Sequence, residues 1–381
     1  MNKTPYIDFY GKHNISPVVN NFDKNVHFSQ RNALYHHLGV YTGFIKGKKV
    51  LEFGPGNGIN AIHTISMKPL EYTLVDANPA GINNCKENLK RYSPNGGWKI
   101  IDSLIEDYKS TELFDLVICE GLLPNQINPS MMAKHCSSFV NKKGVIILTC
   151  HDMVSSVSET LRGMLGEILI KDTHDFDQQV TVLANFFESH LKHLKGASRT
   201  AEEWVVDNIL QTDFWKEAPL FTIPEAIKSL EDDFTVINTS PSFFLDWSWY
   251  KDVNENTKDH FNKIAVDSYW GSVHNFIDYS FVTPNRGKSD NKLLYDICNT
   301  IRDRVSLSSA DNKTSINLVV EACSELLNAL PVEQIETKLA IESYISGINY
   351  YINEGKVNSE IFSYFESWWG RGTQYISFIK S

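Results

Sequence analysis

The feature that most constrains the fold is a glycine-rich turn between a short apolar run and a helix-like segment. Residues 49–53 (KVLEF) predict a buried strand, and residues 54–58 (GPGNG) follow with glycine at every second position. Glycine lets a chain turn sharply from strand to helix and lets a ligand approach the backbone closely. The isoleucines at positions 59, 62 and 65 then recur every three residues, which predicts a helix. This order predicts an α/β unit whose turn faces a ligand.

Strands and helices alternate along the residues that follow. Further strands are predicted at 72–76, 98–102, 114–120 and 144–150, and two more at 234–240 and 243–250, the last of them rich in aromatic residues. Alternation of this kind predicts a parallel sheet covered by helices. Between and after these strands the apolar residues are spaced as in helices. The fold class is therefore α/β, with a helical insertion and a helical C-terminal addition.

This pattern divides the chain into five predicted parts. They are a helical N-terminal arm (1–45), a ligand-binding α/β core (46–152), a helical insertion or lid (153–230), the last strands of the sheet (231–285) and a C-terminal helical region (286–381).

An acidic residue ends the second predicted strand. Asp76 lies 22 positions after Gly54, a separation at which a carboxylate can accept hydrogen bonds from both hydroxyls of a ribose. A dinucleotide fingerprint would have a third glycine at position 59, where this chain has Ile59. The carboxylate of Glu52 is unfavourable beside a pyrophosphate but favourable beside a sulfonium cation. The residues therefore favour S-adenosylmethionine over NAD.

The stretch from 46 to 152 resembles the class I S-adenosylmethionine-dependent methyltransferases, which have a Rossmann-like seven-stranded sheet. The aromatic run at 247–250 and the WWGRG sequence at 368–372 are similar to bacterial glycan- or metabolite-modifying methyltransferases. The resemblance implies a cofactor cleft lined by the glycine turn, the ends of the next three strands and a residue of the N-terminal arm. The implied cofactor residues are Arg31, Glu52, Gly54, Gly56, Gly58, Asp76, Ala77, Asp102, Ser103 and Glu120.

Three of these residues keep an alternative role. Asp102 is also suited to cap a helix, Glu120 to end a strand in solvent, and Arg31 to lie on the surface.

Methyl transfer is an in-line displacement, and a hydroxyl nucleophile also needs a base to take its proton. His151 and Asp152 follow the fifth predicted strand, at the sheet edge where open α/β folds bind ligands. His174 lies in the predicted insertion, which could fold over the cleft. These three residues are the predicted catalytic candidates.

Three further residues are candidates for binding the methyl acceptor. Arg199 and Arg371 could hold an anionic group, with structural salt bridges as the alternative. Trp249 could stack on a ring, although aromatic strand residues more often belong to the core.

No metal site is predicted. His190 and His193 share a helix face near acidic residues at 172, 175 and 177, but hydrogen-bonded histidines on a helix are much commoner than ligands. The six cysteines form no CxxC pair, which argues against zinc and disulfides.

Composition restricts the partners. The formal charge of −10 disfavours nucleic acid, and the longest apolar stretch, about seven residues, is too short for a membrane span. The start of the chain lacks a secretory pattern, so a cytoplasmic location is expected. The predicted acceptor is a small molecule or a glycan, and an oligomer stays open. The alternatives are a protein side-chain methyltransferase, a noncatalytic cofactor-binding module and, less favoured, an NAD-dependent oxidoreductase.

Overall fold

The computed structural model describes residues 22–124, 126–197, 199–216, 219–244, 246–253 and 256–381. The predicted N-terminal arm begins among residues 1–21, which lie outside the described part. The described part of the arm holds helices α2 (Lys24–His37) and α3 (Thr42–Ile45). No helix among the described residues is long and apolar enough to cross a membrane.

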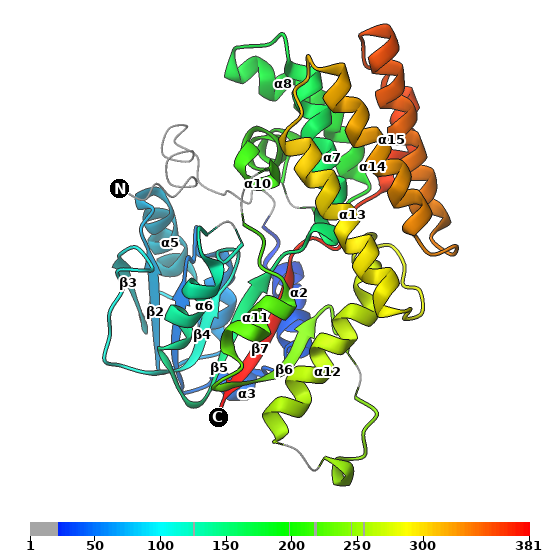
Figure 1. Cartoon of the computed structure of the whole chain (residues 1–381). Coiled ribbons are helices and arrows are strands. Elements are labelled where there is room, and N and C mark those ends of the chain that lie inside the picture. Colours follow the sequence, from blue (N-terminus) through cyan, green and yellow to red (C-terminus); the bar gives the residue numbers. More distant parts are fainter. Residues whose placement is uncertain (1–21, 125, 198, 217–218, 245, 254–255) are drawn as a thin grey trace.

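Seven strands form one sheet, in the order β3-β2-β1-β4-β5-β7-β6 (Figure 1). They are β1 (Lys49–Phe53), β2 (Glu71–Asp76), β3 (Trp98–Asp102), β4 (Phe114–Cys119), β5 (Val140–Cys150), β6 (Phe234–Ser240) and β7 (Gln374–Lys380). The neighbours among β1 to β5 pair in parallel, whereas β7 runs antiparallel to both β5 and β6. The predicted α/β fold with a seven-stranded sheet is confirmed. The carboxyl ends of the five parallel strands meet at one edge.

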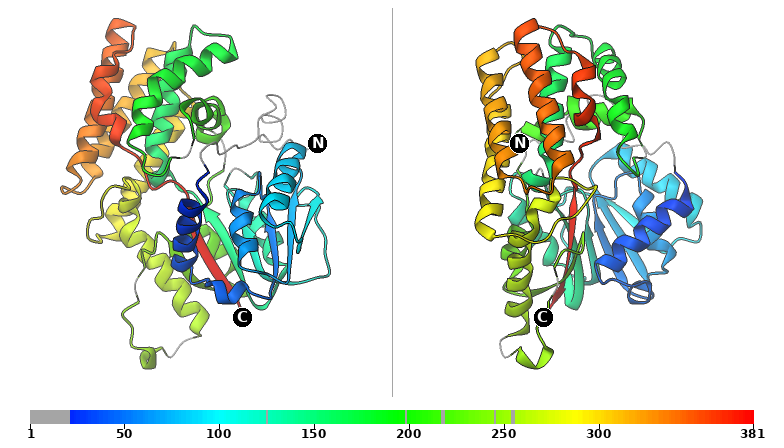
Figure 2. Two further views of the ribbon diagram at one scale, coloured as in Figure 1. Left: turned by 180° about the vertical axis from the view of Figure 1, so that it is seen from behind. Right: turned by 90° about the vertical axis from the view of Figure 1, so that its right-hand side faces the viewer.

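Helices cover both faces of the sheet, because alternate strand residues bury opposite sides (Figure 2). Val50 and Ile147 lie in the cluster that packs against α2, α4 and α5, whereas Leu51 and Ile146 lie in the cluster that packs against α6 and α11. The covering helices are α4 (Ile59–Ser66), α5 (Pro79–Tyr92), α6 (Pro129–Ser137), α11 (Ile223–Leu230) and, beside β6, α12 (Thr257–Ser272).

The last strands differ from the prediction. β6 occupies the predicted residues, but the strand predicted over 243–250 is wrong: its described residues form a loop that leads into the short helix η2 (Tyr250–Asp252). Trp247 and Trp249 are 90% and 58% exposed there. The seventh strand is β7, in a region for which the pattern predicts helix. Because β7 pairs with both β5 and β6, it completes the sheet without the aromatic run.

Two segments far apart in the sequence build one helical lobe beyond the sheet edge (Figure 1). The first segment holds α7 (Met153–Ile170), α8 (Phe176–Lys192), α9 (Ala201–Val205), the π-helix η1 (Val206–Leu210) and α10 (Thr212–Lys216). The second holds η3 (Val273–Phe276), α13 (Lys288–Ser306), α14 (Lys313–Ala329), α15 (Ile335–Glu354), η4 (Ser359–Phe362) and α16 (Ser363–Ser367). α7 packs against both α8 and α13, and α16 packs against α8. The second segment is therefore an insertion between β6 and β7, not a terminal addition.

A buried arginine ties the two segments of the lobe together. Arg162 of α7 is fully buried and donates from Nη2 to the carbonyl of Phe365, at 3.1 Å. Its guanidinium carbon lies 3.7 Å from the ring centroid of Trp369, and its Nε lies 3.3 Å from Nδ1 of His190 in α8. Burial lowers the pKa of Arg162 to about 9. Carbonyl groups and ring faces thus stabilise this cation.

The chain returns from the lobe to the sheet through residues 368–373. Trp368 donates from Nε1 to the carbonyl of Ile277 at 2.7 Å, and Gly370 packs directly on the backbone of Ser155 in α7. Arg371 donates from Nε to the carbonyl of Asn275 at 2.7 Å and from Nη2 to that of Phe281 at 2.9 Å. This segment therefore fixes the lobe against the sheet edge.

Candidate functional site

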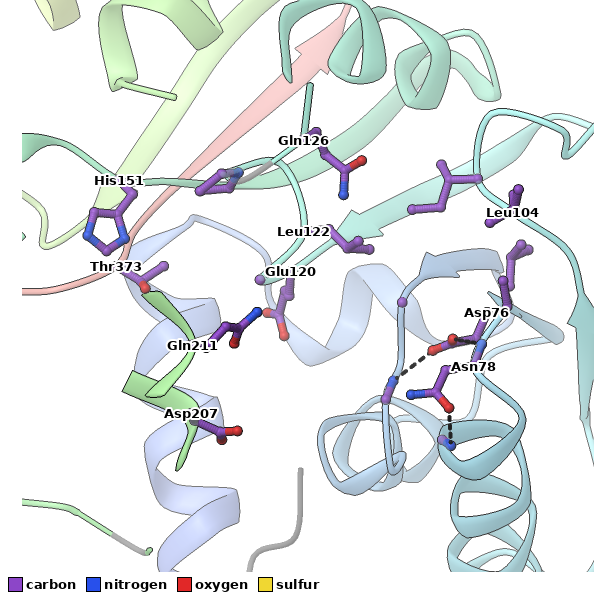
Figure 3. A pocket seen from close by; sticks show the side chains of 18 of the residues that line it. Asp76, Asn78, Leu104, Glu120, Leu122, Gln126, His151, Asp207, Gln211 and Thr373 are labelled. Carbon is purple, nitrogen blue, oxygen red and sulfur yellow. Dashed lines mark hydrogen bonds between the residues drawn. The ribbon is translucent and has the colours of Figure 1, made fainter. Parts of the chain in front are cut away.

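A cavity of about 410 Å³ lies at the carboxyl edge of the parallel strands (Figure 3). The sheet supplies one wall, and residues from 199 to 211 and Thr373 supply the other. Its lining residues are Gly54, Gly56, Val75, Asp76, Ala77, Asn78, Gly81, Ser103, Leu104, Ile105, Glu106, Glu120, Gly121, Leu122, Pro124, Gln126, His151, Arg199, Asp207, Asn208, Gln211 and Thr373.

The glycine turn after β1 opens onto this cavity. Gly54 and Gly56 have φ of +65° and +54°, a conformation that favours glycine. A Cβ on Gly54 would lie 2.2 Å from Cδ1 of Leu122, and one on Gly58 would lie 2.6 Å from Sγ of Cys85. A Cβ on Gly56 would meet no atom within 4 Å. Gly54 and Gly58 thus permit close packing, whereas Gly56 leaves its backbone open to a ligand.

Asp76 joins this turn to the one that follows β2. Its carboxylate accepts a hydrogen bond from the backbone N–H of Gly56 at 3.2 Å and from that of Asn78 at 2.8 Å (Figure 3). The side chain of Asn78 in turn caps α5 by accepting from the N–H of Ala80 at 3.0 Å. Burial raises the pKa of Asp76, and the backbone N–H groups partly oppose that rise. The carboxylate is thus held at the cavity wall by both turns.

The residues after β3 also line the cavity. Ser103 and Leu104 do so, and the N–H of Ser103 donates to the carbonyl of Asp76 at 3.0 Å. Asp102 is exposed and lies outside the lining, because β3 is the edge strand of the sheet. The structure therefore places Ser103, but not Asp102, in the site.

Glu120, after β4, lies between the two ends of the cavity. Arg31 of α2 donates to both of its carboxylate oxygens, at 3.0 and 2.9 Å, and the side-chain amide of Asn60 donates at 3.2 Å. Both members of the ion pair are 7% exposed. Burial disfavours the charged guanidinium, but the attraction of Glu120 outweighs this and raises the pKa of Arg31. Arg31 therefore positions Glu120 and is not itself part of the lining.

Glu52 lies behind the cavity wall. It is 3% exposed and accepts a hydrogen bond from the hydroxyl of Tyr72. Burial and the nearby charge of Glu120 raise the pKa of Glu52 to about 8. The side chain is therefore mainly protonated near neutral pH. The sequence analysis expected a charged Glu52 carboxylate beside the sulfonium, and the free protein does not present one.

Replacing Glu52 by glutamine tests this protonation state. The folded protein binds the Glu52 proton more tightly than the unfolded chain, whose pKa is near 4.5, so stability is lost as pH rises from about 4.5 to about 8. Glutamine mimics the protonated form. At pH 9, urea denaturation is expected to give Glu52→Gln a free energy of unfolding on the order of 1 kcal/mol or more above that of the native protein. This difference in stability should disappear toward pH 5. A difference that is the same at both pH values would contradict this expectation.

The opposite end of the cavity is polar. Gln126, His151, Arg199, Asp207, Asn208, Gln211 and Thr373 line it. Arg199 forms an ion pair with Asp207. Figure 3 shows His151, Thr373, Gln211 and Asp207 at one end, Asp76 and Asn78 at the other, and Glu120 between them.

His151 is held rigidly at this polar end. Its backbone pairs with Phe221, whose carbonyl accepts from the His151 N–H at 2.8 Å. The residue is 8% exposed. Burial, with the nearby charge of Arg302, lowers the pKa of His151 to about 4. The imidazole is therefore neutral at neutral pH and can accept a hydrogen bond.

Arg31, Glu52, Gly58 and Asp102 do not line the cavity, and four further sequence-based candidates also lie outside the lining. Asp152 is fully buried and caps α7, accepting from the N–H of Ser155 at 2.9 Å. His174 is exposed between α7 and α8. Trp249 is exposed on the loop after β6. Nε and Nη2 of Arg371 donate to backbone carbonyls. Helix capping and chain anchoring account for Asp152 and Arg371.

Several lining residues were missed by the sequence reasoning. The Asn78-Pro79 pair is a helix-start signal, so Asn78 could have been found. Asp207, Asn208 and Gln211 depend on the π-helix, and Thr373 precedes the unpredicted strand β7. No metal-binding group of three or more His, Cys, Asp or Glu side chains occurs among the described residues.

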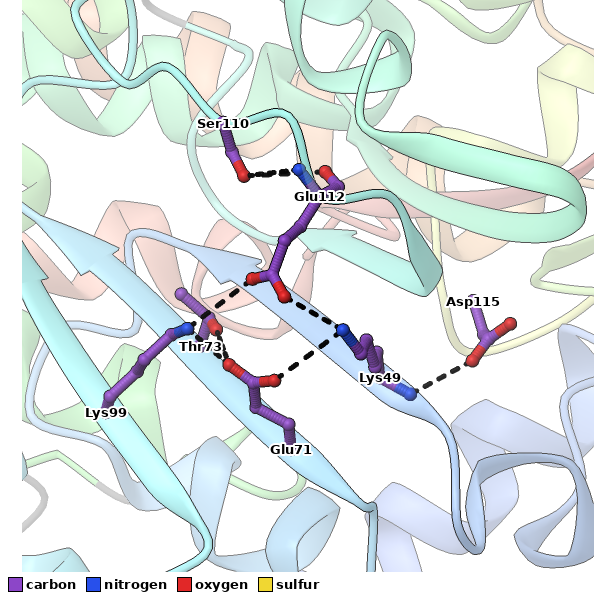
Figure 4. A network of polar contacts seen from close by, with 7 residues as sticks. All are labelled: Lys49, Glu71, Thr73, Lys99, Ser110, Glu112 and Asp115. Atoms are coloured by element: carbon purple, nitrogen blue, oxygen red, sulfur yellow. Dashed lines mark hydrogen bonds and ion pairs between the residues drawn. The ribbon is translucent and has the colours of Figure 1, made fainter.

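A second cluster of charges lies at the opposite edge of the sheet (Figure 4). Lys49 Nζ lies 2.8 Å from Glu112 and 4.0 Å from Glu71, and Lys99 pairs with both carboxylates. These side chains are between 29% and 47% exposed, so each ion pair contributes little to the stability of the fold. The cluster joins the starts of neighbouring strands and belongs to the fold.

Comparison with known proteins gives a consistent picture. Residues 28–192 match the model of a family described as a methyltransferase domain. The chain is 21% identical over 185 residues to a ubiquinone biosynthesis O-methyltransferase of Rickettsia felis, covering 44% of this chain and 71% of the relative. The corresponding protein of Rickettsia prowazekii is 20% identical, with 44% and 69% covered.

Solved structures with weaker similarity include the N-methyltransferase NodS from Bradyrhizobium japonicum with bound S-adenosyl-L-homocysteine. Identity is 15%, coverage is 39% of this chain and 74% of that one, and the TM-score is 0.32. Coclaurine N-methyltransferase is 12% identical, with 94% and 74% covered and a TM-score of 0.38.

Proposed function

We propose that the chain is a class I S-adenosylmethionine-dependent methyltransferase that methylates a hydroxyl or amine of a small polar acceptor, a free metabolite or a sugar; its match to a methyltransferase-domain family over residues 28–192 supports this. The observation that carries this proposal is one continuous cavity with two chemically different ends. One end has the features that a nucleoside needs, and the other is lined mainly by polar side chains.

The residues at the first end fit the cofactor. The open space beside Gly56 admits a ligand against the backbone, and Asp76 offers carboxylate oxygens at the cavity wall. Asp76 would hold the ribose hydroxyls, while Leu104 and Ile105 offer apolar surface for the adenine. Glu120 would face the methionine portion. Bound S-adenosylmethionine supplies a methyl group on a sulfonium, which a nucleophile can displace.

His151 is the proposed general base. It lies at the polar end, and its neutral imidazole can accept the proton of an acceptor hydroxyl as the oxygen becomes nucleophilic. Because the lowered pKa makes this imidazole a weak base, its expected contribution is at the low end of general-base catalysis. The backbone bridge to Phe221 fixes the main chain of His151 before the acceptor binds, and burial restricts the side chain. An amine acceptor would bind unprotonated and need less help.

The activity test uses S-adenosylmethionine with a tritiated methyl group. Acceptor sets would be small alcohols, phenols, sugars, amines and a pool of peptides. We expect label in a small hydroxyl or amine compound and none with Asp76→Ala. Label in peptides alone would support protein methylation instead, and cofactor binding without any transfer would indicate a noncatalytic module.

Replacing His151 by asparagine tests the role of the base. With a hydroxyl acceptor, kcat is expected to fall by about 100-fold, the lower end of what general-base catalysis contributes. The Kd for S-adenosylhomocysteine should stay within about twofold, since His151 lies at the far end of the cavity from Asp76. An unchanged kcat would remove His151 from the mechanism.

A further inference from the structure

The polar end of the cavity is formed largely by residues 199–216, here called the cap. α9 begins at a capping box made by Thr200 and Glu203, and it continues directly into the π-helix Val206–Leu210. π-Helical turns are rare and are frequently found at functional sites. Asp207 and Asn208 from this turn, and Gln211 directly after it, line the cavity. The cap therefore presents a set of polar groups that the sheet does not supply.

The cap is packed closely against α7. A Cβ on Gly163 would lie 2.3 Å from the ring of Trp215, and one on Gly166 would lie 2.4 Å from Cγ2 of Ile209. The indole of Trp215 also donates to the carbonyl of Ile209 at 3.1 Å. These contacts fix the π-helix and thereby the position of Gln211.

Gln211 is a buried amide that faces the cavity. Only 4% of the residue is exposed, and its side chain has no hydrogen-bond partner within the described part of the chain. Its side chain points into the cavity on the side of Glu120 (Figure 3). The amide atoms are not sealed from solvent, so water reaches them through the cavity in the free protein. An acceptor that displaces this water has to offer hydrogen bonds in its place, because an amide left unpaired would cost about 1–3 kcal/mol.

The charges at this end of the cavity, and Glu120 at its centre, already have partners. Asp207 pairs with Arg199, and Glu120 pairs with Arg31. A charged acceptor would have to compete with one of these ion pairs. An uncharged acceptor with hydroxyl groups can bind Gln211, Asn208 and Thr373 without disturbing them.

We propose that Gln211 selects an uncharged acceptor that presents neighbouring hydroxyl groups, as a neutral sugar or polyol does. This inference rests on the proposed function and names its acceptor class. The amide donates through its NH₂ and accepts through its oxygen, so it can bind two neighbouring hydroxyls, one as acceptor and one as donor. A carboxylate on the acceptor could only accept and an ammonium could only donate, so either would pair with one half of the amide.

The test measures methyl transfer to matched probes. Neutral hexoses, 6-deoxyhexoses, pentoses and inositol are compared with glucuronic acid and glucosamine, using the native protein and tritiated S-adenosylmethionine. At least one neutral probe is expected to have a kcat/KM about 10-fold or more above both charged probes. Preference for a charged probe, or no transfer to any neutral probe, would overturn the proposal.

Variants at position 211 distinguish a role of Gln211 in selecting the acceptor from a role in folding alone. Gln211→Leu should lower kcat/KM for the neutral probe by about 10–100-fold, mainly through the acceptor KM, and Gln211→Glu should shift preference toward glucosamine. Gln178→Leu, an exposed glutamine of α8, is the matched control and should change neither. Unchanged acceptor KM in Gln211→Leu would refute the role of Gln211.

S-adenosylhomocysteine titration distinguishes the two levels of the account. All three variants should bind it within about twofold of the native protein, because none alters the Asp76 end. If the native protein does not bind it, the proposed function fails. If binding is intact and only charged acceptors are methylated, the acceptor class alone fails.

Discussion

Replacing Asp76 by alanine is expected to lower the affinity for S-adenosylhomocysteine by about 100-fold or more, because hydrogen bonds to a charged group contribute about 1.5–3 kcal/mol each. The carboxylate would lose its bonds to the ribose hydroxyls. It would also release the backbone N–H groups of Gly56 and Asn78, which it now holds at 3.2 and 2.8 Å. Both effects act on the same end of the cavity.

Asp76→Asn is the matched variant for this prediction. Asparagine keeps the size and one oxygen, but its NH₂ group cannot accept from a backbone N–H or a ribose hydroxyl. An affinity loss of about 10-fold, between native and alanine, is therefore expected. Isothermal titration gives the Kd values, and thermal unfolding checks the fold. Binding by Asp76→Ala within threefold of native would show that Asp76 does not hold the ligand.

Replacing Gly370 by alanine has the largest expected effect on stability. A Cβ at this position would lie 1.8 Å from the backbone carbonyl oxygen of Ser155 and 3.3 Å from that of Phe276. Neither atom is the end of a flexible side chain, so the 368–373 segment would have to move away from α7. We expect a loss of about 4 kcal/mol or more, which is the range of severe core disruptions.

Gly271→Ala is the control for that substitution. Gly271 lies in α12, and the nearest atom to its added Cβ is 3.6 Å away, an ordinary contact. Its unfolding free energy should stay within about 1 kcal/mol of native, since alanine favours helix. Urea denaturation measures both variants. A Gly370→Ala protein as stable as Gly271→Ala would contradict the packing described for this segment.

The sheet was largely predictable because its signals are local. Each of β1 to β6 is a short apolar run next to a turn or a helix pattern, and the glycine turn is followed at a fixed distance by Asp76. β7 was not predictable in the same way. Whether Gln374–Lys380 or the aromatic run at 243–250 joins the sheet depends on pairing with β5, which lies more than two hundred residues earlier in the chain.

The two ends of the cavity also differ in how well the sequence predicts them, because one depends on local signals and the other on contacts between distant segments. The residues around Gly56 and Asp76 follow from motif spacing within one α/β unit. The other end combines His151, Gln211 and Thr373, which come from three distant segments and meet only after the lobe has folded. Arg371 and Asp152 have suitable chemistry in the sequence, but hydrogen bonds to the surrounding backbone engage them elsewhere. A side chain's type alone did not show whether it would face the cavity.

The most direct test of the central claim is a calorimetric titration of the native protein with S-adenosylmethionine and, separately, with NAD. We predict saturable binding of S-adenosylmethionine in the micromolar range, with one site per chain and no heat of binding for NAD. Binding of NAD, or of neither compound, would contradict the assignment of this cavity to S-adenosylmethionine.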